Sequence, residues 1–445
     1  MTNHLNLSIS FVTSSIILFI VLGFVQYVPV TLDIILRGDV VMWTLGRSLM
    51  EESGYIKYLK DIFLVAYGVY WPVKLTFTTS NATAILAMKA YFIWLFLVFI
   101  FGVVGFFLDL SPLFFLLAGV RWLLLLHVAF GFFILALVSG THIREDNLIF
   151  NVLLFTLSVN VLLIFFQLRL VGIEHGLSIG SSRLTGVFSN AGLAGFFSVS
   201  VALLSVVYLD ISQNKKTLLL FLCLIVALAS GTRFAMICVF LCFSFVLFDI
   251  LKARLDRKLL IVIFVFALPV ATVIFYSTMI DVVGRGDIFE TSLASGGRID
   301  NFIRYSSILL HAEPVEFFFG RGLGIGTNTA FSLVNAVGGL PESYRFNWLV
   351  DNTLLTVFFQ LGLIGSIVFW TGVLSVFILS YFICSSKVSK YFKLLIAIFI
   401  LSLFTSNLFE QYYLIITYMF VLGVICNKSQ RLFDQNNNDV SNTNT

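Results

Sequence analysis

The segment AILAMKAYFIWLFLVFIFGVVGFFL, Ala84–Leu108, decides the fold class. Lys89 is its one charged residue, and it exceeds the roughly 20 apolar residues that a helix needs to cross a bilayer. Similar apolar runs recur along the chain, and charged residues make up only 11% of 445. Soluble domains carry roughly 25%. We therefore predict an all-α, polytopic transmembrane helical bundle.

The same criterion predicts about twelve spans along the chain. They are residues 8–30, 61–75, 84–108, 111–139, 148–168, 191–209, 217–230, 234–251, 259–276, 353–382, 394–406 and 412–425. The chain then divides into N-terminal transmembrane helices (1–168), a first outer loop (169–190), central transmembrane helices (191–279), a large outer loop (280–352), C-terminal transmembrane helices (353–426) and a disordered cytoplasmic tail (427–445).

Lysine and arginine in short loops predict the orientation, because they are enriched on the cytoplasmic side. Basic residues at 215–216, 252–258, 387–393 and 428–431 occupy connections that are separated by even numbers of predicted spans. These connections therefore share the cytoplasmic face with both termini. The loops 169–190 and 280–352 then face outward.

The large outer loop is expected to contain short helices and a site for a phosphate-bearing lipid. The run RIDNFIRYSSILLHAEPVEFFF, residues 298–319, predicts a short amphipathic helix near the membrane surface that ends before Pro314. The basic residues of the loop are all arginines, at Arg285, Arg298, Arg304, Arg321 and Arg345. A guanidinium binds phosphate oxygens through two parallel hydrogen bonds and stays charged when partly desolvated. Ordinary salt bridges remain the alternative, for example between Asp300 and Arg304.

Two further arginines lie within apolar surroundings. Arg233 stands between two predicted spans, where a cation is costly unless it meets an anion, so it is a candidate site residue. Arg121 interrupts LLAGVRWLLLLH, and a structural ion pair or snorkelling explains it equally well.

The remaining composition indicates neither a cofactor nor a metal site. The five cysteines lie in or at the ends of apolar runs, which predicts no disulfide framework. Cys238 and Cys242 are one helical turn apart, and we interpret them as packing residues rather than metal ligands. The net charge of +4 gives no indication of a nucleic-acid partner, because the cations follow the membrane topology.

Five short motifs, taken together with their order, resemble the shared region of the O-antigen ligases and O-antigen polymerases, the Wzy-like family. They are RLTGVFSNAGLAGFF (Arg183–Phe197), SGTRFA (Ser230–Ala235), SGGRIDNF (Ser295–Phe302), FFFGRGLGIG (Phe317–Gly326) and DNTLLTVFFQLGLIG (Asp351–Gly365). Each is weak alone, and the glycine repeat is equally typical of helix packing or of a loop.

The resemblance implies a substrate, a reaction and a location. The substrate is an oligosaccharide on undecaprenyl diphosphate, and the reaction is glycosyl transfer at the periplasmic face of a bacterial cytoplasmic (inner) membrane, without a nucleotide or a metal. Asp351 stands where the ligase pattern has histidine, which favours a polymerase. A ligase of the same family and a lipid-linked oligosaccharide transporter (flippase) are the alternatives. The partners implied are membrane lipids and a chain-length regulator protein, with no nucleic acid.

The same resemblance assigns roles to individual residues. Arg183, Arg233 and Arg298 would stabilise the leaving diphosphate, with Arg304 and Arg321 in support. Asp351 would position or deprotonate the acceptor hydroxyl, or cap the following helix, or both. Asn352 would orient the acceptor, and Asn190 would bind substrate. The glycines of residues 320–326 would let the backbone approach substrate or let the loop move.

Overall fold

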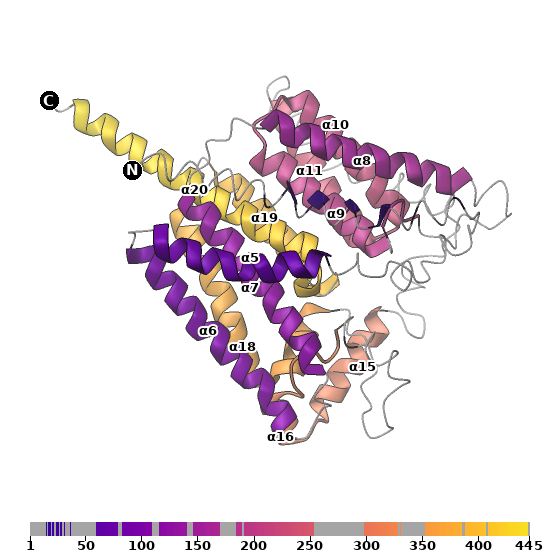
Figure 1. Ribbon diagram of the computed structural model, residues 1–445, viewed down its shortest axis with the longest axis vertical. Helices are drawn as coiled ribbons and strands as arrows, with labels where there is room; N and C mark the ends of the chain where they lie inside the picture. Colours follow the sequence, from indigo (N-terminus) through magenta and orange to yellow (C-terminus); the bar gives the residue numbers. More distant parts are fainter. Residues whose placement is uncertain are drawn as a thin grey trace. The chain divides into compact units, whose positions relative to one another are not determined.

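A computed structural model describes single positions between 15 and 36 and the residues that follow (Figure 1). They are 59–78, 82–108, 115–139, 146–169, 184–188, 191–252, 298–327, 330, 352–384, 388–405 and 408–443. These residues are almost entirely helical, and no strand occurs among them. The predicted all-α class is therefore confirmed for this part of the chain. The chain forms two compact units, which we call unit 1 (residues 1–12, 64–142 and 293–445) and unit 2 (residues 13–63 and 143–292).

Unit 1 contains most of α5 and the helices that carry the candidate site. They are α5 (Leu59–Thr78), α6 (Ala82–Phe107), α7 (Phe115–Ser139), α15 (Arg298–Leu310), α16 (Pro314–Phe319), α18 (Thr353–Ile383), α19 (Ser389–Thr405), the 3₁₀ turn η5 (Leu408–Glu410) and α20 (Tyr412–Thr443). The closest packing joins α20 with α7 and α18 with α6, and α16 packs against α18 and α6 (Figure 1).

Unit 2 is built around α10. Its helices are α8 (Asp146–Arg169), α9 (Ala191–Leu203) with its π-helical continuation η3 (Leu204–Tyr208), α10 (Gln213–Ser230) and α11 (Arg233–Lys252). Helix α10 packs against α8, α9 and α11, and α9 also packs against α11.

Seven helices of the described chain are long and apolar enough to cross a membrane: α6, α7, α8, α10, α11, α18 and α20. Many of their apolar side chains face outward; Ile93 and Phe96 of α6, for example, are 63% and 62% exposed. Lipid accepts such side chains without penalty, so this surface suits a helical membrane protein. Helices α5 and α19 also coincide with predicted spans. The predicted span 259–276 lies outside the described residues, as does most of 8–30.

An aromatic core joins α5, α6 and α7 in unit 1. Trp71 is fully buried, and the rings of Tyr91 and Phe130 stack with centroids 3.8 Å apart. His127 Nε2 donates to the carbonyl of Gly68 at 3.0 Å, and Nδ1 accepts from the hydroxyl of Tyr91 at 3.4 Å. A neutral imidazole satisfies both partners at once, so His127 locks the three helices together.

The C-terminal tail differs from its predicted disorder, because α20 continues to Thr443. The first part of this helix is packed: Cys426 is buried, and the Ser429 hydroxyl donates to the carbonyl of Ile383 at 2.7 Å. Starting a helix is costly, whereas each added residue gains a hydrogen bond. The packed part of α20 therefore supports continued helix in a polar sequence that would not start one by itself.

Candidate functional site

The centre of the site in unit 1 is a break in α18. Gly362 has φ 65° and ψ −170°, a conformation that is not helical and is essentially restricted to glycine. In an unbroken helix, the carbonyls of Phe359 and Gln360 would accept from residues four positions later. Here they accept from the backbone N–H groups of Arg321, at 2.8 Å, and Gly322, at 3.1 Å.

Residues 320–327, the glycine segment, insert between α6, α7 and α18. The N–H of Leu323 donates to the carbonyl of Gly102 on α6 at 2.8 Å. The fully buried side chain of Gln360 accepts from the N–H of Gly324 and donates to the carbonyl of Ile325, both at 3.2 Å. Non-helical backbone survives at membrane depth only where its polar groups find such partners. These contacts lie roughly one to three turns inside the helix ends, so the segment packs alongside the three helices and not beyond them.

The glycines allow backbone segments of the protein to approach one another closely. A Cβ on Gly320 would lie 2.6 Å from the carbonyl oxygen of Gln360, and one on Gly362 would lie 2.5 Å from the carbonyl of Phe318. A Cβ on Gly105 of α6 would meet the backbone of Arg321. The expectation that these glycines admit substrate or loop movement is therefore corrected: the segment is buried, and the packing interpretation of the repeat is confirmed.

The side chain of Arg321 extends from this segment and is a largely buried cation. Its Nη2 lies 2.5 Å from a carboxylate oxygen of Glu316 on α16, and the two side chains are 14% and 18% exposed. Burial lowers the pKa of Arg321, and the neighbouring Glu316 carboxylate opposes this shift. The pair borders a shallow depression whose other lining residues are apolar, namely Ile308, Leu309, Ala312, Phe358 and Phe359. Of the predicted arginines, Arg321 thus combines charge, burial and an apolar neighbourhood.

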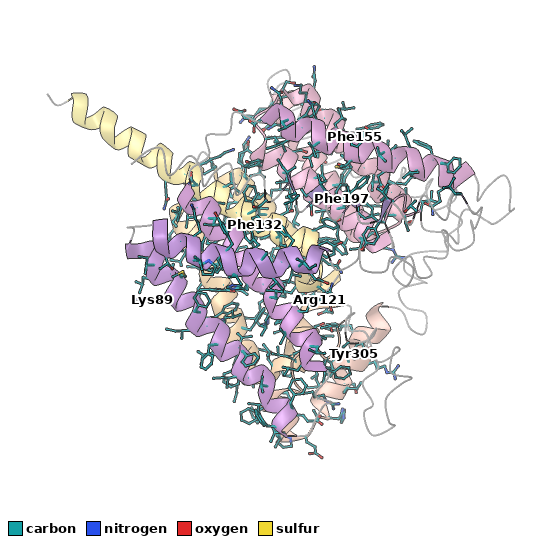
Figure 2. All side chains as sticks on the ribbon, in the orientation of Figure 1. Lys89, Arg121, Phe132, Phe155, Phe197 and Tyr305 are labelled. Carbon is teal, nitrogen blue, oxygen red and sulfur yellow. The ribbon has the colours of Figure 1, made fainter. Side chains whose placement is uncertain are left out.

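Helix α15 confirms the predicted amphipathic helix of the large loop and carries two predicted arginines. Arg298 is its first residue, and its side chain lies outside the described part. Arg304 is exposed beside Phe302 and Ile303, which are 44% and 62% exposed. On the opposite face, the ring of Tyr305 packs edge-on against Phe359 of α18, with centroids 5.8 Å apart (Figure 2).

Asn352, which is predicted to orient the acceptor, is hydrogen-bonded within the protein. Its Oδ1 accepts from the N–H of Leu355 at 3.1 Å, which makes it the N-cap of α18, and its Nδ2 donates to the carbonyl of Phe404 at 3.5 Å. Both ends of the amide are therefore engaged within the protein, and the residue is buried. The predicted cap at Asp351 falls one residue later in the structure, and Asp351 itself lies outside the described residues.

The turn 184–188 forms a second candidate region, in unit 2. Its first N–H, that of Leu184, donates at 3.1 Å to the carbonyl of Ala229, one turn before Arg233. Arg233 is the first residue of α11 and is half-buried. The segments next to Arg183 and Arg233 in sequence therefore meet at one end of unit 2, while Arg183 and Asn190 themselves lie outside the described residues.

Two amides that the sequence analysis did not select hold this turn. Gln167 Oε1 accepts from the N–H groups of Thr185, at 3.0 Å, and Gly186, at 3.1 Å. Asn160 Oδ1 accepts from Val187 N–H at 2.9 Å. The available signal was their spacing, because two amides seven residues apart in an apolar run lie on one helix face.

No protein-family model matches the chain, and no curated protein sequence is significantly similar to it. The similarity to the O-antigen family therefore rests on the short motifs alone.

Proposed function

We propose that this protein polymerises a bacterial surface polysaccharide such as O-antigen. It would transfer a growing glycan chain from its lipid diphosphate to a sugar hydroxyl of an incoming undecaprenyl diphosphate-linked repeat unit, at the periplasmic face. The observation that carries the proposal is Arg321, a largely buried guanidinium fixed beside an apolar depression. A lipid diphosphate combines the two features that such a place would recognise, a phosphate anion and an apolar chain.

The chemistry needs charge stabilisation more than it needs an activating cofactor. The glycosyl–diphosphate bond already stores the energy of transfer, and negative charge develops on the leaving diphosphate. Guanidinium groups held in place beforehand stabilise such charge well, because they need no reorganisation during the reaction. Backbone hydrogen bonds join residues 321–322 to the broken α18, so they fix the position of the Arg321 backbone from which the guanidinium extends. Arg298 of α15 belongs to the same unit, whereas Arg183 and Arg233 stay separate predictions in unit 2.

Glu316 sets the condition under which Arg321 would bind substrate. A guanidinium has five N–H donors, so a diphosphate would bind beside Glu316 or would replace it. Replacement of one buried anionic partner by another keeps the cation paired, provided that the displaced Glu316 carboxylate turns toward solvent. The ion pair therefore keeps the site stable between turnovers.

A transporter of lipid-linked oligosaccharides is the second candidate, and the break in α18 favours it. Discontinuous helices form the substrate and ion sites of many transporters, where unwound carbonyls bind the cargo. In this protein, however, the carbonyls of Phe359 and Gln360 at the break already accept from Arg321 and Gly322. The break is thus used to hold the glycine segment, which suits a fixed catalytic site better than a moving one.

Electrophoresis of surface glycan from a strain that lacks the gene tests the proposal. A polymerase defect leaves single-repeat glycan, and the wild-type gene restores the ladder. Full-length polymer that is not attached to its acceptor would instead indicate a ligase. Repeat units trapped at the cytoplasmic face would indicate a transporter. An unchanged ladder in the deletion strain would reject all three.

A further inference from the structure

Helix α15 packs against α18 through one apolar side. Tyr305 is buried and contacts Leu355 and Phe359 of α18. Ile308 and Leu309, which share this side of α15, pack against the same cluster. An amphipathic helix needs only one such side, so this contact accounts for the amphipathic pattern of the sequence by itself.

A second apolar side of α15 is exposed. Leu310 is 77% exposed, and Phe302 and Ile303 are exposed as well. A helix turns by about 100° per residue, so these three side chains share one arc of roughly 100°. The exposed polar residues share the next arc, and they are Arg304, Ser307 and His311. The exposed surface of α15 is therefore divided along its length into an apolar side and a polar side, which indicates two different surroundings.

Helix α16 adds two exposed apolar residues that adjoin the surface of α18. Val315 and Phe318 are exposed and three positions apart, so they share one side of α16. A Cβ on Gly362 would lie 2.5 Å from the carbonyl oxygen of Phe318, so α16 touches the break in α18. Beyond the break, Ile364 and Ile367 of α18 are exposed in turn. The exposed apolar residues of α15 and α16 thus continue those of a helix that is apolar enough to cross a membrane.

The end of α6 gives the level at which α16 lies. The apolar span of α6 covers Ile85–Phe107, and Phe107 is 85% exposed. A Cβ on Gly105 would meet the backbone of Arg321, two residues after α16. Helix α16 also packs against α6 itself, and both helices reach the same end of unit 1 (Figure 1). The apolar side chains of α16 therefore stand where a bilayer that surrounds α6 would have its boundary.

We infer that α15 and α16 lie in the surface of the lipid bilayer. The polar side of α15, with Arg304, faces headgroups and water, as in other helices that lie in the membrane interface. The depression beside Arg321 is lined by α15 and α16, so a phosphate carried by a lipid reaches it from the side. This binding is independent of the polymerase function proposed above. The side chains that enter the acyl chains form the apolar stripe, which consists of Phe302, Ile303, Leu310, Val315 and Phe318.

A protein partner, such as a second copy of this chain, is the alternative occupant of the apolar stripe. Exposed apolar residues bordered by polar ones mark contacts of either kind. Continuity with α18 favours lipid, because the acyl chains that cover Ile364 and Ile367 then cover the stripe as well. A protein partner would have to displace lipid from α18 to cover the same surface.

Fluorescence quenching in liposomes tests the inference. Full-length protein with Cys384→Ser keeps four native cysteines, all buried, so one added cysteine can be labelled with a polarity-sensitive dye. At Leu310→Cys, the emission should shift to the blue and be largely lost when the lipids carry bromine on their acyl chains. At His311→Cys, the next residue but on the polar side, neither change should occur. Ile367→Cys, in the span of α18, gives the quenching of a lipid-facing position for comparison.

Two outcomes would overturn the inference. Quenching at Leu310→Cys that is no stronger than at His311→Cys would show that the stripe does not enter the acyl chains. A blue shift at Leu310→Cys without quenching by brominated lipid would show that protein covers the stripe. If Leu310→Cys does not fold, Ile303→Cys and Arg304→Cys form the equivalent pair. Polymer formation plays no part in these measurements, so a failure of the proposed polymerase function would leave their result unchanged.

Discussion

Substitution of Gly362 by alanine should release the glycine segment from α18. The backbone of Gly362 occupies a region that is essentially glycine-only, which costs an alanine about 1–3 kcal/mol. The new Cβ would also lie 2.5 Å from the carbonyl of Phe318, a backbone group that cannot rotate away. The strain is relieved when the segment withdraws, and the N–H groups of Arg321 and Gly322 then lose their carbonyl partners.

The magnitude follows from these two contributions. Each buried backbone group left without a partner costs about 1–3 kcal/mol. Water reaches a withdrawn segment, so we count the smaller value for each of the two N–H groups. These unpartnered groups oppose withdrawal in wild type and variant alike, whereas the backbone strain of about 1–3 kcal/mol is present only in the docked variant. Gly362→Ala should therefore shift the equilibrium toward the withdrawn state by about 5–150-fold.

Cysteine labelling in intact cells measures this withdrawal. Leu323 is fully buried between α6 and α7, so a Leu323→Cys variant should be protected from a membrane-impermeant maleimide. Addition of Gly362→Ala should expose it. Ser366→Ala, one turn further along α18, is the matched control because it leaves the break intact. Equal protection of Leu323→Cys with and without Gly362→Ala would refute the proposed role of the break.

Three further substitutions test other parts of the structure. Arg321→Ala should reduce polymer formation more than tenfold, because the transition state loses a charge-assisted contact of about 1.5–3 kcal/mol, while Lys89→Ala, an exposed charge of α6, should leave the glycan ladder unchanged. Gln167→Leu should lower the melting temperature more than Asn160→Leu, because it leaves two turn N–H groups without partners instead of one; equal melting temperatures would contradict this. His127→Ala should destabilise detergent-solubilised protein by about 1–3 kcal/mol, because this half-buried side chain gives up two hydrogen bonds, and an unchanged melting curve would count against its place in the core.

Apolar periodicity predicts the helices well because each one is a local property of the sequence. Residues 84–108 were predicted as a span, and α6 covers Ala82–Phe107. Helix α15 likewise follows from the amphipathic pattern before Pro314. The C-terminal tail was the exception, because its helix depends on the packed residues that precede it.

The packing of the glycine segment could not be predicted in the same way, because it depends on partners far away in sequence. The glycines of 320–326 and the Gly362–Gly365 pair were both selected as motifs, but neither motif indicates that the two segments contact each other. The bond from the Asn352 amide to the end of α19 could not be predicted for a related reason, because its partner lies more than fifty residues away. Polar residues inside apolar runs, such as Gln360 and Asn160, were the unused signal for these contacts.

The contact between the glycine segment and α18 makes a final prediction about how Arg321 works. The N–H of Arg321 is bonded to the broken helix, so the position of its guanidinium depends on the conformation of Gly362. If preorganisation of this charge is the purpose of the break, Gly362→Ala and Arg321→Ala remove the same contribution to catalysis. Their effects on the polymerisation rate should then combine to clearly less than their sum in free energy, because coupled residues are not additive. Full additivity would mean that the break supports the fold and that Arg321 acts without its help.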